Sequence, residues 1–343
     1  MKKSLLRPLY ILIFSLLLPG FVAAQQDSLT VPLLLEQPSF YNYNFLYKKR
    51  LDSIQKMVPL PYNEFVQKYI DIYSSRKDMF GKMLGLSSYY FPIFEQALKS
   101  YNIPEEIKYL PIIESAMDPL AVSRTGATGL WQFMYTTAKG YRLTMDEFID
   151  ERRDPLMASN AAAAYFRDSY ADLGDWLLCL AAYNCGKGAV TRAMAKAGSK
   201  DFWVIRPFLP LETRNYVPAF IAAVYMMNCA KAHQVNAQQC PMILKTDVLL
   251  VDHHVSLPLL AQALDVEESI LCGLNPGYKK KIVNGSVASP KRLIMPKASL
   301  ANFALVYEVL NSGSNVPLVP EPGKKYISYK PGASQAQSAS GKM

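Results

Sequence analysis

Histidine is scarce in this sequence, and its scarcity narrows the chemistry that the chain can perform. The 343 residues include only three histidines, two of them adjacent at His253 and His254. They form no cluster with metal-ligand spacing, and we can place no serine–histidine–acid arrangement. We therefore expect neither a bound metal nor another cofactor.

Cysteine is also infrequent, and its five copies are an odd number that cannot fully pair. Cys229 and Cys240 flank a polar stretch and are the candidates for a disulfide in an oxidising compartment. Cys179 and Cys185 lie in an apolar, helix-like stretch, and we interpret them as small fillers of the core.

Clustered positive charge is lacking. The formal net charge is +9, but the longest basic run is only Lys279 to Lys281. Because nucleic-acid binding requires lysine and arginine gathered on one face, a nucleic acid is not an expected partner. A mild, dispersed positive charge suits an anionic polymer outside the cytoplasm.

No apolar run is long enough to span a bilayer comfortably, since about 20 residues are needed. The run from Leu9 to Leu18 follows a basic start and precedes Val22-Ala23-Ala24. This pattern predicts a secretory signal peptide at residues 1–24 and a mature protein in the periplasm or cell envelope. An uncleaved anchor is the alternative. No cysteine follows the run, so a lipoprotein anchor is not expected.

The middle of the chain is predicted to be an all-α domain over residues 62–243, after an irregular, proline-containing segment at 25–61. Proline followed by two acids at Pro104 is typical of a helix start. Alanine-rich and apolar stretches predict further helices at 158–170, 176–183 and 211–232.

Residues 244–300 have a different pattern, with the order strand, helix, helix, strand and an Asn-Pro-Gly turn at 275–277. This βααβ order resembles the LysM module, a small fold that binds peptidoglycan and chitin. His254-Val255-Ser256 stands where that family usually has Gly-Asp-Thr, so glycan binding and a purely structural role both stay open. Residues 301–343 are predicted to be a tail, partly disordered.

One acid stands out in the helical region. Glu114 interrupts the apolar stretch from Tyr109 to Ala116. An apolar surrounding raises the pKa of a carboxylic acid and keeps it protonated near neutral pH, as a general acid requires. An ion pair with Lys108 or Arg124 is the alternative.

Three further clusters of polar residues follow Glu114, each in an apolar or glycine-rich context. Taken singly, each is explained by capping or by a satisfied buried polar group; together they supply an acid, amides and hydroxyls suited to sugars. They lie at Gly126–Met134, Ala181–Gly186 and Leu211–Val217.

The ordered set Glu114-Ser115, Gly129-Leu130-Trp131-Gln132, Ala182-Tyr183-Asn184 and Glu212 to Val217 resembles the soluble-type lytic transglycosylase family. The resemblance covers about residues 85–235 and implies an α-helical, lysozyme-like domain. It implies Glu114 as the catalytic residue. The substrate-binding residues that it implies are Ser115, Ser123, Gln132, Met134, Tyr183, Asn184, Glu212 and Tyr216.

The resemblance implies peptidoglycan glycan strands as the partner and cleavage of the MurNAc–GlcNAc β-1,4 bond by a single acid/base. The product would be a 1,6-anhydro sugar. Two alternatives stay open: a lysozyme-like muramidase that uses water, and a wall-binding protein without catalysis. Peripheral association with the membrane or wall is left open as well. Asp118 and Cys185 depart from the family's usual residues, but neither is the proposed acid.

Overall fold

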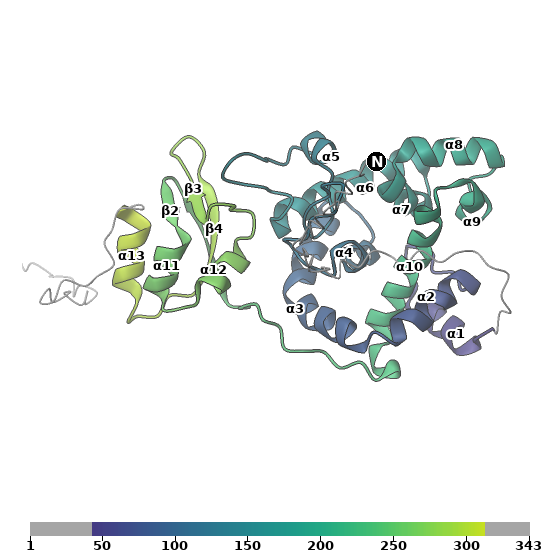
Figure 1. Ribbon diagram of the computed structural model, residues 1–343, viewed down its shortest axis with the longest axis horizontal. Coiled ribbons are helices and arrows are strands. Elements are labelled where there is room, and N and C mark those ends of the chain that lie inside the picture. Colours follow the sequence, from purple (N-terminus) through teal and green to yellow (C-terminus); the bar gives the residue numbers. More distant parts are fainter. Residues whose placement is uncertain (1–42, 313–343) are drawn as a thin grey trace, which may run out of the picture.

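The computed structural model describes residues 43–312, and most of its elements are helices (Figure 1). A helical part lies on one side of the molecule and a smaller α+β part, from Thr246 onward, on the other (Figure 1). Each part has its own cluster of buried apolar residues. Over residues 43–312, no helix is long and apolar enough to cross a membrane. The predicted signal peptide at 1–24 lies outside the described residues.

Helix α10 (Leu211–Asn228) is the centre of the helical part. It is buried from Thr213 to Met227 with the exception of Arg214. Among the helices that pack against it are α2 (Glu64–Ser74), α4 (Leu110–Ser115) and α7 (Trp176–Cys185). A helix that is apolar on all sides is stable only inside a protein, so α10 organises the core around itself.

The remaining helices enclose this centre. Helix α6 (Pro155–Leu173) begins where the carboxylate of Asp154 accepts the backbone N–H groups of Leu156 and Met157, and it ends before Gly174, which has a φ of 70°. The other helices around α10 are α3 (Lys77–Ser100), η1 (Glu105–Tyr109), α5 (Tyr135–Gly140), α8 (Lys187–Ala197), α9 (Phe202–Ile205), η2 (Arg206–Phe208) and η3 (Ala230–His233).

The segment predicted to be irregular, residues 25–61, contains a helix, so this prediction was wrong in part. Helix α1 (Phe45–Ile54) starts at Asn44, whose side chain accepts the N–H groups of the first turn. Its sequence has little amphipathic pattern. Tertiary contacts stabilise it instead: Leu51 is fully buried, and Arg50 donates a hydrogen bond to the Tyr225 hydroxyl at 2.9 Å.

The α+β part has the predicted βααβ order, with two short strands added. Strand β1 (Thr246–Val251) pairs antiparallel with β4 (Lys291–Pro296) in a register that joins Thr246 to Pro296. Helices α11 (Leu257–Leu264) and α12 (Glu268–Leu274) lie between them in the chain. The unpredicted β2 (His254–Ser256) and β3 (Ile282–Asn284) form a second antiparallel pair.

Part of the predicted tail is also helical. Helix α13 (Phe303–Ser312) packs on α11 and buries Val306 and Val309 in the apolar cluster of the module. Residues 301–312 are therefore part of the small domain, which corrects the prediction for that stretch. Residues 313–343 lie outside the described range.

The connection between the two parts lies against α3 along part of its length (Figure 1). The backbone N–H of Gln238 donates to the carbonyl of Gly81 at 2.9 Å. A Cβ atom at Gly81 would stand 2.7 Å from the Asn236 carbonyl oxygen, and one at Gly85 would stand 2.3 Å from that of Gln238. Glycine at these two positions allows the chain to approach this closely.

Candidate active site

Glu114 lies near the end of α4, a short helix that a sharp turn terminates. Ala116 and Met117 both adopt left-handed backbone conformations, with φ of 54° and 62°. Ser115 points into the interior, where its hydroxyl donates to the carbonyl of Leu130 at 2.9 Å. Ser115 therefore connects α4 to the glycine-rich segment by a hydrogen bond, and Glu114, the preceding residue, faces the site.

The carboxyl of Glu114 is enclosed by protein atoms, although the side chain keeps some accessible surface. The pKa of Glu114 is raised from 4.5 to about 8, and burial is the main cause. The nearby charge of Glu212 also raises this pKa. The hydroxyl of Tyr216, which donates a hydrogen bond to the carboxyl, lowers it. Lys108 does not pair with Glu114, because its ammonium bonds Glu95. Glu114 is therefore mainly protonated at neutral pH.

Tyr183 and Tyr216 are brought to the same place from α7 and α10. The hydroxyl of Tyr183 donates to the carbonyl of Trp131 at 2.7 Å, and its ring stacks on Phe166 at 5.2 Å between centroids. Burial, with the neighbouring Glu114, holds the pKa of both tyrosines well above the usual value. Both phenols thus stay neutral donors.

Asn184 and Glu212 form a second polar group at the ends of α7 and α10. The Asn184 amide donates to the Glu212 carboxylate at 3.3 Å, and its oxygen accepts the hydroxyl of Thr213 at 2.7 Å. Glu212 lies one helical turn before Tyr216, but it is exposed, whereas Tyr216 is buried. The two carboxylates of the site therefore have different environments.

The segment 121–134 forms a compact loop whose side chains largely stabilise the loop itself. Gln132 has a φ of 48°, and its amide donates to the carbonyls of Gly129 and Ala121 at 2.9 and 3.2 Å. The hydroxyl of Ser123 accepts the N–H of Ala127 at 3.0 Å. Met134, at the start of α5, is 43% exposed.

Two residues that the sequence analysis missed hold this loop. Arg152 donates to the carbonyls of Gly126 and Phe133 at 3.0 and 3.3 Å. The carboxylate of Asp150 binds the guanidinium from the other side at 3.0 and 2.8 Å, and both side chains are largely buried. In the sequence these two belong to a charged run at 150–154, which is typical of an exposed turn, so no local signal distinguished them.

Asp118 has the turn-capping role that its place before a proline favours, since its carboxylate accepts the N–H of Leu120 at 2.8 Å. The five cysteines, all within the described residues, are free thiols. The disulfide considered for Cys229 and Cys240 is therefore not formed in this structure. Cys179 is fully buried, as expected for a core filler.

Comparison with known proteins gives two domain matches. Residues 91–206 match the family model of the transglycosylase SLT domain, and residues 245–311 match that of the LysM-like domain of lytic transglycosylase MltD. The resemblance inferred from the motifs is thereby confirmed, and so is the order of a mainly α domain followed by a small α+β domain. The first match ends before Glu212 and Tyr216.

Individual relatives carry related names. Membrane-bound lytic murein transglycosylase D of Escherichia coli strain K12 is 33% identical over 206 residues, which are 58% of this chain and 44% of that protein. The peptidoglycan transglycosylase gp16 of Escherichia phage T7 is 35% identical over 138 residues, 39% of this chain and 10% of that protein. The chain thus spans less than half the length of either relative.

Among solved structures, the 70 kDa soluble lytic transglycosylase of Escherichia coli is similar with a TM-score of 0.36 and 25% identity. The alignment covers 42% of this chain and 24% of that one.

Proposed function

We propose that this chain, which carries a transglycosylase SLT domain at residues 91–206 and a LysM-like domain at 245–311, is an exported peptidoglycan lytic transglycosylase. It cleaves the MurNAc–GlcNAc β-1,4 bond and leaves a 1,6-anhydro-MurNAc end. The observation that carries the proposal is the enclosed carboxyl of Glu114, with a pKa of about 8 and a hydrogen bond from Tyr216.

In the first step Glu114 acts as the acid. Its proton passes to the glycosidic oxygen, so that the GlcNAc portion leaves as a neutral alcohol while positive charge develops at C1 of MurNAc. A carboxyl with a pKa of about 8 is already protonated at pH 7. The Tyr216 hydroxyl orients the carboxyl during this transfer.

In the second step the same group acts as the base. The C6 hydroxyl oxygen of MurNAc bonds to C1, and its proton returns to Glu114, which restores the starting state of the enzyme. No water and no second carboxylate are consumed, because the nucleophile is part of the substrate. Acid–base catalysis contributes roughly 10²–10⁴-fold, so positioning of the sugar must supply much of the remainder.

We assign that positioning to Gln132, Tyr183, Asn184 and Glu212. The Asn184 and Glu212 pair offers an amide and a carboxylate at the surface, groups that suit the acetamido and hydroxyl substituents of a sugar. Ser123 and Met134, both accessible on the loop, are assigned to contacts with neighbouring sugars, and Ser115 to holding α4 in place.

A muramidase that uses water is the second candidate, and one observation favours it. The charge of Glu212 raises the pKa of Glu114, so a second carboxylate is present near the site. Glu212 could then activate a water on the far side of the sugar.

Digestion of purified wall in ¹⁸O-labelled water separates the two candidates. A transglycosylase gives MurNAc ends that carry no label and are one water lighter than reducing ends. Entry of label at C1 would establish the muramidase instead. Binding to wall without any released muropeptide would point to a non-catalytic wall-binding protein.

A further inference from the structure

The LysM-like domain, called the module below, is docked on one loop of the helical part, residues 143–154, which we call the docking loop. This loop follows α5 and reaches toward the module (Figure 1). The N–H of Asp150 donates to the Gly277 carbonyl at 2.8 Å, and the N–H of Lys279 donates to that of Phe148 at 2.8 Å. These two bonds flank an antiparallel bridge between Ile149 and Tyr278. The contact is therefore a short piece of β-pairing.

A partly buried ion pair lies beside this pairing. One guanidinium nitrogen of Arg292 on β4, Nη2, donates to both carboxylate oxygens of Asp154, at 2.6 and 2.5 Å. The side chains are only 24% and 19% exposed. The hydroxyl of Tyr278 donates to the backbone carbonyl of Arg292 at 2.6 Å, which fixes β4 in place. Because Asp154 also caps α6, this pair joins the module to the start of a core helix.

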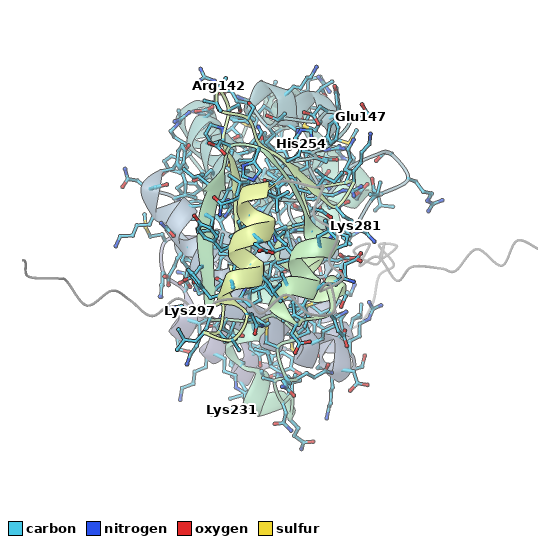
Figure 2. The ribbon with its side chains drawn as sticks, turned by 90° about the vertical axis from the view of Figure 1, so that its left-hand side faces the viewer. Arg142, Glu147, Lys231, His254, Lys281 and Lys297 are labelled. Carbon is cyan, nitrogen blue, oxygen red and sulfur yellow. The ribbon has the colours of Figure 1, made fainter. Side chains whose placement is uncertain are left out.

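The outer rim of the contact is weaker. Lys280 pairs with Glu147, and its ammonium stands 4.6 Å from the centre of the Phe148 ring. The His254 ring lies 6.0 Å from that of Phe148. Figure 2 shows Glu147 and His254 near one edge of the module, and Lys281 and Lys297 elsewhere on its face. Exposed pairs of this kind contribute little, so the β-pairing and Arg292 carry the contact.

The opposite side of the docking loop holds the candidate active-site loop. Asp150, whose N–H bonds the module, binds Arg152 with its carboxylate, and Arg152 bonds the carbonyls of Gly126 and Phe133. The docking loop approaches the backbone of the active-site loop closely, since a Cβ atom at Gly129 would stand 1.9 Å from the Arg152 carbonyl oxygen. One short segment thus connects the module to the loop that contains Gln132.

A second tether limits the freedom of the module. Besides its backbone bond to Gly81, Gln238 donates through its side-chain amide to the Asp78 carbonyl at 3.0 Å. The connecting chain therefore lies against α3 just before the module begins. A tethered partner binds its site as an intramolecular event, with a high effective concentration.

We propose that the module is an intramolecular brace for the active site. It fixes the docking loop, the docking loop fixes Arg152, and Arg152 holds residues 121–134 in the geometry that the substrate requires. Arg152 is a positioning residue in this arrangement. The consequence for catalysis rests on the proposed function, whereas the mechanical coupling does not.

The test is hydrogen–deuterium exchange of the full chain carrying Arg292→Met. Amides of residues 126–133 should exchange roughly three- to tenfold faster than in the wild type, the range expected for losing a partly buried ion pair. Lys281→Met is the matched control, because the Glu268 partner of Lys281 belongs to the module itself. Lys281→Met should leave the exchange rates of residues 126–133 unchanged. Arg292→Lys should restore protection in part, since lysine keeps the charge but not the planar guanidinium.

A stronger perturbation keeps the proposal falsifiable. Arg292→Glu with Lys280→Glu places like charges opposite Asp154 and Glu147 and should expose residues 148–150 to exchange. If those amides open while 126–133 stay protected, or if neither stretch changes, the brace is refuted.

Activity gives an independent measurement. Arg292→Met should raise the KM for wall several-fold more than it lowers kcat, with the pH profile unchanged, because Glu114 is untouched. A fall in kcat as large as the rise in KM would argue against a positioning role. If the chain proves inactive on wall altogether, the proposed function fails, but the exchange result still decides the brace.

Discussion

The candidate active site has two walls, and a different kind of interaction stabilises each of them. The wall formed by α4, α7 and α10 is apolar and closely packed, and it encloses Glu114 together with Tyr183 and Tyr216. The other wall, residues 121–154, consists of loops and the short helix α5, and polar contacts hold it through Arg152 and Asp150. The first wall sets the proton affinity of the acid. In the proposed reaction, the second wall sets where the substrate lies.

This difference separates the effects that substitutions should have. Changes in the helical wall alter the desolvation and hydrogen bonding of Glu114, so they should appear in kcat and in its pH dependence. Changes in the loop wall leave that environment intact and should appear mainly in KM. The following predictions test this separation.

Glu114→Gln should have the largest effect and stop turnover. The amide can neither donate a proton to the glycosidic oxygen nor take one from the C6 hydroxyl, which removes at least the roughly 10²–10⁴-fold of acid–base catalysis. Circular dichroism and sedimentation with insoluble wall should be unchanged. Release of muropeptides by the folded variant would refute the assignment of Glu114.

Arg152→Met should come next. It removes both bonds to the loop carbonyls and leaves the buried Asp150 carboxylate with the backbone N–H of residue 152 at 3.2 Å and the more distant Arg153 at 3.9 Å. Breaking a buried pair costs about 3–5 kcal/mol, so we expect a lower melting temperature and a KM raised by about tenfold. Arg152→Lys should recover part of the stability. A pH profile that moves with Arg152→Met would contradict the separation of the two walls.

Tyr216→Phe should have a smaller effect, on the helical wall. The Tyr216 hydrogen bond lowers the pKa of Glu114, so its removal should raise that pKa above about 8 and move the alkaline fall of activity to higher pH. The rate should drop about fivefold, as for a lost hydrogen bond of about 1 kcal/mol. Tyr183→Phe is the control, because the Tyr183 hydroxyl bonds the Trp131 carbonyl. For Tyr183→Phe, the alkaline fall of activity should stay at the same pH as in the wild type.

Glu212→Gln should have the smallest effect. The charge of Glu212 raises the pKa of Glu114, so its removal should lower that pKa and shift the alkaline limb downward. An exposed carboxylate interacts weakly across solvent, and we expect roughly a twofold loss of rate with the same anhydro product. A product that changes to reducing ends, or activity that is abolished, would assign Glu212 a direct chemical role.

Much of the architecture was predictable from local pattern. The apolar runs of α7 and α10, the proline start at Pro104 and the βααβ order all have short-range signals that burial then reinforces. Helices α1 and α13 were missed because their own sequences are ambiguous. Contacts at Tyr225 and α11, distant in the chain, decide their structure.

The sequence by itself singled out Glu114, Gln132 and Asn184 as candidates, because an acid in an apolar stretch and amides in apolar or glycine-rich contexts are unusual enough to stand out. Only the tertiary structure decided how they are used. It enclosed Glu114 and gave it the hydroxyl of a tyrosine from a helix that begins 97 positions later, and it left Glu212 at the surface. It also gave Asp150 and Arg152 their role. Desolvation and long-range hydrogen bonds depend on distances in space, which the order of residues does not record.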